Sequence, residues 1–418
     1  MKKSLLAVAA IGAFASAAQA QSSVTVYGIL DVGYIGSNSR VSSSAITSNG
    51  GQYKQTGSQF GQGAEQSNRL GFKGTEDMGG GTSAFFTAEF QLYPESTTVS
   101  GDSNGGLLNR QTFVGLKKNG IGQTAIGLQY TPVFNAAAAT DVGQLNNMAG
   151  NVVYSATTGV GATGSSINNA AFTNRTSNTL SVKSDNFGGF TASAIYTLNN
   201  KNVSQINATS GGNTNASGWG LGADYTYNKF FIAASYQALK QLTTASNLNP
   251  TVATSAGTGA VTVTGSSPWT SASGEALGAG FASAGNPLNI QDNQFYAGAT
   301  YDFGILKAYA QYVSRKATNT ASSNFYLKRS AEQIGVRSYI TPTVEAWASA
   351  GLGRYTSYGA NQPTANFNGW QLGSNYYLSK RTNLYAIYGQ TLTSNSAAAG
   401  VTTSSGYNNY AVGVRHTF

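Results

Sequence analysis

Basic side chains occupy one face of several segments in which apolar and polar residues alternate. Around residue 70, Leu70 and Phe72 share one face, so Arg69 and Lys73 share the other. Fixed positive charges on one face of a strand would attract anions if that face lined water, so the chemistry to test against the rest of the sequence is ion selection. The same reasoning predicts two further inward basic residues, Arg175 and Lys183, with Leu180 and Val182 outward. Arg110 would also face inward if Phe113 and Gly115 face outward, although the polar Gln111 then faces outward as well.

Residues that could support catalysis are scarce. The sequence has no cysteine, and its single histidine, His416, cannot by itself build a zinc site or activate a visible nucleophile. The run from Gly159 to Gly164 matches G-x-G-x-x-G, but it lies among small polar residues rather than between a strand and a helix. We therefore predict no enzyme activity, no cofactor and no bound metal.

Segments of about ten residues alternate between apolar and polar types, as expected of strands with one lipid face and one wet face. In the first segment, residues 24–34, the apolar set faces outward and leaves Tyr27 and Asp31 on the inner face. In residues 82–93 the same pattern places Glu89 inside. The additional pore-lining residues expected on this basis are Tyr27, Asp31, Lys73, Glu89 and Lys183.

The connections between these segments alternate between short and long. Seven are short turns, such as Asn228-Lys229, and eight are long loops, including 36–64, 131–174 and 240–290. Fifteen connections give sixteen antiparallel strands with both chain ends on one side, as an up-and-down membrane barrel requires. The short turns then belong to the periplasmic rim and the long loops to the extracellular rim. Because Val261 to Thr264 alternates within the longest loop, an eighteen-stranded barrel is the structural alternative.

Composition favours a membrane β-barrel and argues against several other classes. Charged residues make up 9% of the chain, against about 25% in soluble domains. Mean hydropathy is −0.19, and no stretch after residue 20 is apolar for long enough to form a transmembrane helix. The net charge of +9 comes from scattered lysines and arginines rather than a dense run, so nucleic acid is not expected as a partner.

Residues 1–20 predict a signal peptide. A basic start, an apolar run over 5–14 and the A-x-A cleavage site Ala18-Gln19-Ala20 occur in the required order. We therefore expect export, a mature chain that begins at Gln21, and a single barrel domain over residues 21–418 in the outer membrane.

A sixteen-stranded barrel needs a loop that narrows it. Closure at this size leaves an interior too wide for side chains to fill, so an aqueous channel is expected. The candidate for the narrowing element is the third long loop, residues 131–174. Its stretch Ala136–Ala139 is small enough to lie against the inner wall, and Asp141 is its only acidic residue. We predict that this loop folds inward and forms the constriction.

Five stretches in this order resemble the trimeric general-diffusion porins of Gram-negative outer membranes, of the type found in Neisseria and Burkholderia relatives. They are SSVTVYGILDVGY (22–34), SNRLGFKGTEDMGGG (67–81), NRQTFVGLKKNGIG (109–122), NRTSNTLSVKSDNFGGF (174–190) and YAVGVRHTF (410–418). The resemblance implies a homotrimer, with outer-membrane lipid and lipopolysaccharide as further partners. It also implies that Arg69, Arg110 and Arg175 face Asp141 across the constriction.

The C-terminal Phe418 has two interpretations. The resemblance implies that the barrel-assembly machinery reads the final strand through this residue. Alternatively, Phe418 is an ordinary member of the aromatic girdle that faces lipid.

Three arginines against one aspartate would leave the constriction positive. We therefore expect an outer-membrane porin for passive diffusion of small hydrophilic solutes and ions, with a preference for anions. In an alternative interpretation the arginines only stabilise the inner wall through hydrogen bonds. Two other functions stay open. A substrate-specific channel would show an inner ladder of aromatic side chains, and a non-transport surface adhesin would bind through loops 36–64 and 240–290.

Overall fold

The structure is a computed structural model, and it describes residues 23–43, 49–100, 106–154, 169–203, 212–243, 251–254, 261–264, 288–320, 326–358, 364–398 and 401–418. The expected signal peptide, its cleavage site before Gln21 and the glycine-rich run from Gly159 to Gly164 lie outside these residues. Two short helices, η1 (Asn49–Gly51) and α2 (Pro132–Thr140), accompany the strands. In this part of the chain no helix is long and apolar enough to cross a membrane.

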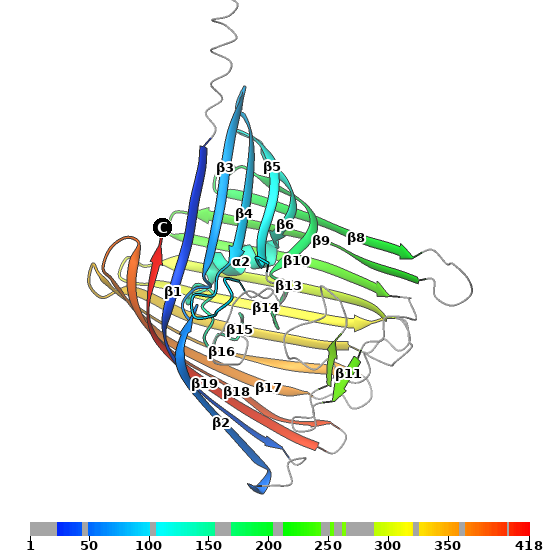
Figure 1. Cartoon of the computed structure of the whole chain (residues 1–418), viewed down its shortest axis with the longest axis vertical. Helices are drawn as coiled ribbons and strands as arrows, with labels where there is room; N and C mark the ends of the chain where they lie inside the picture. Colours follow the sequence, from blue (N-terminus) through cyan, green and yellow to red (C-terminus); the bar gives the residue numbers. More distant parts are fainter. Residues whose placement is uncertain are drawn as a thin grey trace, which may run out of the picture.

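Seventeen strands form one closed antiparallel sheet (Figure 1). Successive strands pair along the chain, and β1 also pairs with β19 from Ile29↔Thr417 to Ser43↔Thr403, which closes the barrel. Closure leaves no unpaired edge, as hydrocarbon surroundings require. The strands are β1 (Ser23–Ser43), β2 (Gln52–Gln62), β3 (Arg69–Gly79), β4 (Thr82–Gln91), β5 (Asn109–Lys118), β6 (Gly122–Tyr130), β7 (Arg175–Ser184), β8 (Phe190–Val203), β9 (Gly212–Tyr227), β10 (Phe230–Thr243), β13 (Leu288–Asp302), β14 (Lys307–Asn319), β15 (Tyr326–Tyr339), β16 (Val344–Tyr358), β17 (Ala365–Tyr377), β18 (Thr382–Ala398) and β19 (Val401–Thr417).

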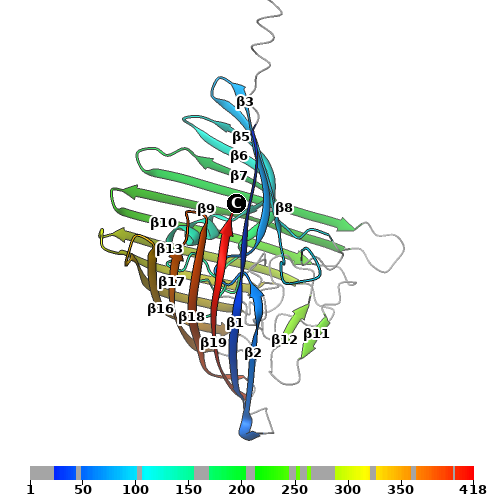
Figure 2. The same ribbon diagram turned by 60° about the vertical axis from the view of Figure 1, so that its left-hand side comes forward.

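Two of these strands, β2 and β3, share one place in the barrel. The first part of β1, Ser23–Ile29, pairs with β3, and the later part, Val32–Ser42, pairs with β2. Figure 2 shows the two strands following one another along β1. The residues between them, 63–68, interrupt what is otherwise one strand. Seventeen strands with two in one place give sixteen positions, which confirms the predicted sixteen-stranded barrel.

Two predicted long loops contain strands instead. The 36–64 segment continues β1 to Ser43 and then forms β2, because its small polar residues still pair through their backbone groups. Inside 240–290, β11 (Thr251–Thr254) and β12 (Val261–Thr264) form a separate two-stranded sheet. Since this hairpin does not enter the barrel sheet, the eighteen-stranded alternative is wrong.

Tight turns join the strands at one rim of the barrel. Asn228 and Lys229 connect β9 to β10, and Asn228 has a φ of 51°, a left-handed value that asparagine tolerates. Four residues, Leu378–Arg381, separate β17 from β18 and include the predicted turn Ser379–Arg381. These connections agree with the predicted short turns.

The two faces of the barrel differ as the alternation predicts. On β1, Val24 is 67% exposed and Val26 is 52% exposed, whereas Asp31 is fully buried. The exposed apolar side chains form the surface that lipid would cover. The opposite face carries hydrogen-bonded glutamine, asparagine, acidic and arginine side chains.

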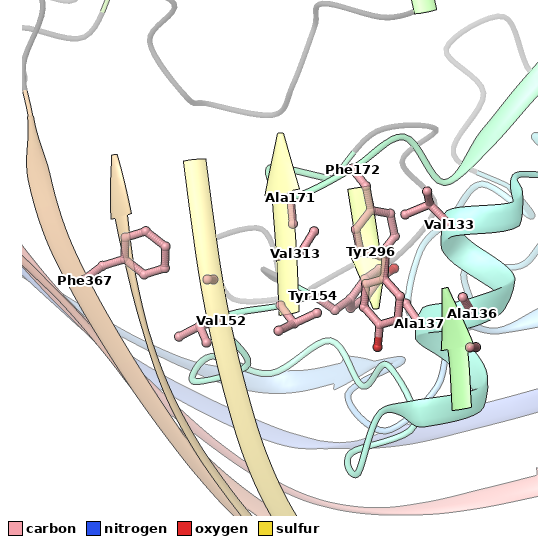
Figure 3. Close-up of a cluster of buried hydrophobic side chains, with 13 residues drawn as sticks. Val133, Ala136, Ala137, Val152, Tyr154, Ala171, Phe172, Tyr296, Val313 and Phe367 are labelled. Carbon is pink, nitrogen blue, oxygen red and sulfur yellow. The ribbon is translucent and has the colours of Figure 1, made fainter. Parts of the chain in front are cut away.

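The 131–174 segment packs inside the barrel. Thr131 caps α2 by accepting the Phe134 N–H at 3.2 Å, and Pro132 stands in the first turn, where it costs no hydrogen bond. The helix lies against the inner face of β9, β10 and β13 (Figure 1). A buried apolar cluster then joins α2 and the returning part of the loop to the wall (Figure 3); it includes Val133, Ala136, Ala137, Val152, Tyr154, Ala171, Phe172, Tyr296, Val313 and Phe367.

Candidate functional site

Arg110 and Glu89 form the centre of a polar cluster on the inner wall. Arg110 Nε donates to Glu89 Oε1 at 2.9 Å, and both side chains are buried. The other Arg110 nitrogens donate to Gln91 at 2.5 Å and to the Tyr130 hydroxyl at 3.1 Å. The Tyr27 hydroxyl donates to the second Glu89 oxygen at 3.1 Å. Because every charged group here has partners, the cluster can remain buried.

The alternation of apolar and polar residues along β5 does not explain why the Arg110 side chain points inward. On β5 the outward residues are Val114 and Leu116, which are 62% and 49% exposed, and not Phe113 and Gly115 as predicted. Simple alternation from these residues would direct Arg110 outward. However, the pairing of β4 with β5 skips Arg110, from Glu89↔Gln111 to Phe90↔Asn109. This β-bulge turns the side chain inward. The predicted inward position is therefore correct, but the predicted parity of Phe113 and Gly115 is wrong.

Arg69 and Arg175 complete the basic wall on either side of Arg110. Arg69 Nη1 lies 3.8 Å from Glu89 Oε1, and its Nε donates to the Ser67 carbonyl oxygen at 3.1 Å. Arg175 Nη1 donates to the Arg110 carbonyl oxygen at 3.1 Å. Its guanidinium carbon lies 5.8 Å from the centre of the Tyr130 ring, within cation–π range. One carboxylate, Glu89, thus stands among three guanidinium groups.

A cavity of about 210 Å³ separates this wall from the inward loop. The wall contributes the three arginines together with Gln66 and Ser67 of the segment between β2 and β3. The loop contributes mainly neutral side chains. The cavity is lined by Gln66, Ser67, Arg69, Arg110, Tyr130, Phe134, Ala138, Gln144, Leu145, Tyr154, Asn174 and Arg175. Within the described part of the chain, the lining therefore holds three cations and no carboxylate.

Asp141 does not line this cavity, contrary to the prediction. It follows α2, is buried, and accepts hydrogen bonds from the Leu145 N–H and the Asn151 side chain, both at 2.8 Å. Burial raises the pKa of its carboxyl. Gln144 and Leu145 have positive φ values of 56° and 54°, which are unfavourable for side chains of this kind. Asp141 therefore acts as the cap of a strained turn that presents these two neutral residues to the cavity.

The remaining predicted residues lie on the inner wall, with different degrees of exposure. Lys73 is exposed, and its Nζ lies 5.4 Å from the centre of the Tyr27 ring. Lys183 is exposed as well. Asp31 points inward but is covered, because Glu65 N–H, Gln66 N–H and the Tyr385 hydroxyl all donate to its carboxylate. Asp31 thus holds the break between β2 and β3 instead of lining open space.

Three wall arginines hold the backbone of the inward loop. Arg315 donates to the Asn169 carbonyl oxygen at 2.7 Å, Arg329 to that of Val152 at 2.7 Å, and Arg337 to that of Val142 at 2.5 Å. Carbonyl oxygens of irregular backbone need such donors when they are buried. These arginines are thus engaged by the loop, whereas Arg69, Arg110 and Arg175 line the cavity.

The turn of the loop is held from the opposite wall by Gln371 on β17. Its side-chain nitrogen donates to Asn146 at 3.0 Å, to the Met148 carbonyl oxygen at 2.9 Å and to the Ala149 carbonyl oxygen at 2.7 Å. Gly389 on β18 leaves the space that this contact needs, because an added Cβ would lie 1.8 Å from the Ala149 oxygen. The loop therefore follows the inner wall and leaves the arginine side open.

A family model for Gram-negative porins matches residues 7–396 of this chain. The chain belongs to the Gram-negative porin family. Relatives of this porin include outer membrane porin protein 32 of Delftia acidovorans, 31% identical over 209 residues, or 48% of this chain and 51% of that protein. An outer membrane porin protein of Bordetella pertussis is 38% identical over 135 residues, or 31% of this chain and 34% of that protein. The chain spans about a third to a half of the length of these two relatives.

The fold of the porin is similar to solved structures over nearly its whole length. An anion-selective porin from Comamonas acidovorans superposes with a TM-score of 0.58 at 20% identity, covering 95% of this chain and 100% of that chain. At this level of identity the likeness concerns the fold. Family membership confirms the resemblance drawn from the five sequence stretches. It also confirms that the chain is not an enzyme, since porins are channels.

Several residues of the porin's cavity escaped sequence reasoning. Tyr130 and Phe134 stack at 4.0 Å between ring centres and form one corner of the cavity. A signal for this corner was present, because Thr131-Pro132 is a typical helix start that would have placed Phe134 in the first turn. No comparable signal marks Gln144 and Leu145, whose positions depend on contacts made by Asp141.

Proposed function

We propose that this porin forms a water-filled outer-membrane channel for passive diffusion of small hydrophilic solutes and ions, with a preference for anions. The observation that carries the proposal is the cavity lining of Arg69, Arg110 and Arg175 with no carboxylate. Glu89 lies behind the arginines and offsets only part of their charge. A fixed excess of positive charge at the narrowest part of a pore favours anions over cations.

The loop side of the cavity supports the same preference. A carboxylate there would balance the arginines, but Asp141 is turned away into the loop and held by Leu145 and Asn151. The loop instead presents Phe134, Ala138, Gln144 and Leu145. The solved relative described as anion-selective has the same barrel fold, which agrees with the proposal.

We further propose that the porin works as a homotrimer. A solved porin of Vibrio cholerae with the same fold is described in a trimer form. The outward face of β1 to β5 is strongly apolar, as a subunit interface or a lipid contact requires; its exposed members include Val24, Val26, Leu30, Phe86, Val114 and Leu116.

Planar-bilayer recordings under a potassium chloride gradient test the proposal. Wild-type protein should give large conductance steps in groups of three and a reversal potential that favours chloride. Arg69→Gln combined with Arg175→Gln leaves only the balanced pair of Arg110 and Glu89 at the wall. A unit charge about 6 Å away in water changes an ion's energy by about 0.7 kcal/mol, with opposite sign for chloride and potassium. The double variant should therefore reduce the chloride-to-potassium permeability ratio by roughly ten-fold for each charge removed.

The matched control is Arg381→Gln, which removes an exposed arginine from a turn at the barrel rim. This variant should keep the wild-type reversal potential. Equal permeability to potassium and chloride in wild type and in the double variant would refute the anion preference. The proposal that the protein forms a channel would still stand. The absence of conductance steps for folded protein would refute the channel itself.

A substrate-specific channel is less well supported. Rings do follow one another inside the barrel, from Tyr130 and Phe134 through Tyr154 and Phe172 to Tyr296. However, Tyr154, Phe172 and Tyr296 are buried in the core between loop and wall (Figure 3). A ladder that guides a solute must be exposed along the pore, whereas Phe172 and Tyr296 are fully buried and Tyr154, which borders the cavity, is only 6% exposed.

A further inference from the structure

The cavity beside the arginine wall has two chemically different sides. The wall supplies three guanidinium groups, and no carboxylate lies among the lining residues of the described chain. The loop supplies an apolar side, formed by Phe134 and Ala138 of α2 and by Leu145 in the turn that follows. A hydrated chloride ion interacts only with the basic side. An anion with an apolar body would contact both sides and bury apolar surface as well.

Two stacked rings form the corner where the basic and apolar sides meet. The Tyr130 and Phe134 rings lie 4.0 Å apart with 7° between their planes, and neither side chain is fully buried. Arg110 donates to the Tyr130 hydroxyl, and the Arg175 guanidinium carbon lies 5.8 Å from the centre of the Tyr130 ring. Tyr154 meets Phe134 edge-on at 6.4 Å. Rings beside cations favour a planar ligand that carries a negative group.

Arg69 is the guanidinium group most available to such a ligand. Its side chain is 17% exposed, against 4% for that of Arg110, and Arg175 is almost fully buried. Among the described residues, Arg69 donates one hydrogen bond, from Nε to the Ser67 carbonyl oxygen. Its Nη1 lies 3.8 Å from Glu89, beyond hydrogen-bond distance. The two terminal nitrogens can therefore hold a carboxylate through two parallel hydrogen bonds.

We propose that this cavity binds aromatic carboxylates. The inference rests on the proposed channel and its anion preference, and it names the class of anion that the pore retains longest. The carboxylate would accept from Arg69, and the ring would lie against Phe134 and Leu145. An apolar cavity of about 150 Å³ accommodates benzene, so the 210 Å³ measured here can hold a benzene ring with one carboxylate.

Block of the chloride current in planar bilayers tests the proposal with three added solutes. Benzoate carries both the ring and the charge. Cyclohexanecarboxylate has the same charge and a similar size but no aromatic ring, and benzamide has the ring without the charge. Since contacts between aromatic rings strengthen binding by roughly three- to ten-fold, benzoate should block at a concentration lower than cyclohexanecarboxylate by that factor. Benzamide should block least.

Variants of Phe134 and Arg69 separate the two contributions. Phe134→Leu keeps an apolar side chain but removes the ring, so both carboxylates should block it equally. Phe134→Tyr keeps the ring and should retain the preference for benzoate. Arg69→Gln should weaken block by both carboxylates by a similar factor. Phe85→Leu is the matched control, because Phe85 shares the inward face of Glu89 and meets Phe113 edge-on at 6.3 Å, outside the cavity.

Equal block of wild type by benzoate and cyclohexanecarboxylate would overturn the aromatic preference, even where the reversal potential still favours chloride. Block by benzamide as strong as block by benzoate would overturn the part assigned to Arg69. A benzoate preference that persists in Phe134→Leu, or that is lost in Phe134→Tyr and Phe85→Leu alike, would overturn the binding site. A wild-type channel without chloride preference in the absence of these solutes would instead refute the proposed function, so the two failures are distinguishable.

Discussion

Arg110 donates from Nε to Oε1 of Glu89 over 2.9 Å, and the pair exists because β5 carries a bulge at Arg110. Without the bulge, the alternation of β5 would direct this arginine into lipid. The bulge thus converts an unfavourable outward charge into an inward one with three partners. Bulges occur often beside functional sites because they redirect one side chain without disturbing the rest of a strand.

Replacing Glu89 with glutamine should increase the anion preference. Glutamine keeps an oxygen for Arg110 Nε but removes the one negative charge among the three arginines. By the same charge estimate, the energy of chloride should fall and that of potassium should rise by about 0.7 kcal/mol each, so the chloride-to-potassium permeability ratio should rise roughly ten-fold. Reversal potentials measure this ratio. Glu345→Gln is the matched control, because Glu345 pairs at 2.7 Å with Arg337, an inner-wall arginine that does not line the cavity, whereas Glu89 pairs with two arginines that do. Equal shifts in both variants would contradict a specific role for Glu89.

Replacing Gln371 with leucine should loosen the inward loop. Leucine has a similar size but cannot donate to Met148 and Ala149, whose carbonyl oxygens would then be buried without this partner. Each lost buried hydrogen bond costs about 1–3 kcal/mol, so the loop should leave the wall more often. Single-channel recordings should show greater open-channel noise and closure at lower voltage. Gln390→Leu, on the outward face of β18, should leave both properties unchanged, and identical traces for Gln371→Leu would refute the anchoring role.

Lowering the pH should strengthen the chloride preference through Asp141. Burial raises the pKa of this carboxyl, so it takes up a proton at a higher pH than an exposed carboxyl near about pH 4. The raised pKa also means that Asp141 contributes most to stability below its unfolded pKa, and that this contribution is lost as the pH rises through the folded value.

Asp141→Asn isolates this effect. Its chloride preference at neutral pH should resemble that of acidified wild type, and it should change less between about pH 7 and pH 4. Reversal potentials of both proteins over this range give the comparison. Identical pH profiles for the two proteins would show that the charge of Asp141 does not affect the ion preference of the pore.

Deleting Phe418 should lower the amount of porin in the outer membrane if the assembly machinery reads this residue. In the folded barrel Phe418 exchanges two backbone hydrogen bonds of 3.1 Å with Gly28, and a Cβ added at Gly28 would lie 2.3 Å from the Phe418 ring. Gly28→Val should therefore disturb closure while leaving the terminal residue in place. We expect a lower melting temperature for Gly28→Val with a near-normal membrane level. Full membrane levels after deletion of Phe418 would contradict the assembly role.

Local pattern determined the barrel. The alternation over residues 24–34 placed Val24 and Val26 on the outer face and Tyr27 on the inner face, and the structure agrees. Turn residues such as Asn228-Lys229 marked the short connections. These features depend only on the two-residue period of a strand and on the conformations that particular residues tolerate, so a single sequence can specify them.

Tertiary structure decided how the site is assembled. The inward position of Arg110 needed a bulge, whose cause lies in the register between β4 and β5 rather than in the residues themselves. Asp141 was expected to oppose the arginines, but the loop folds so that Leu145 and Asn151 enclose its carboxylate. Gln371, more than 200 positions further along the chain, holds the same loop. The sequence by itself thus determined which residues face the interior on regularly alternating strands such as β1, because that choice is local. The tertiary structure decided which inward residues contact one another, because the closed sheet brings distant strands and one long loop together. Hydrogen-bond partners depend on position in space and not on position in the sequence.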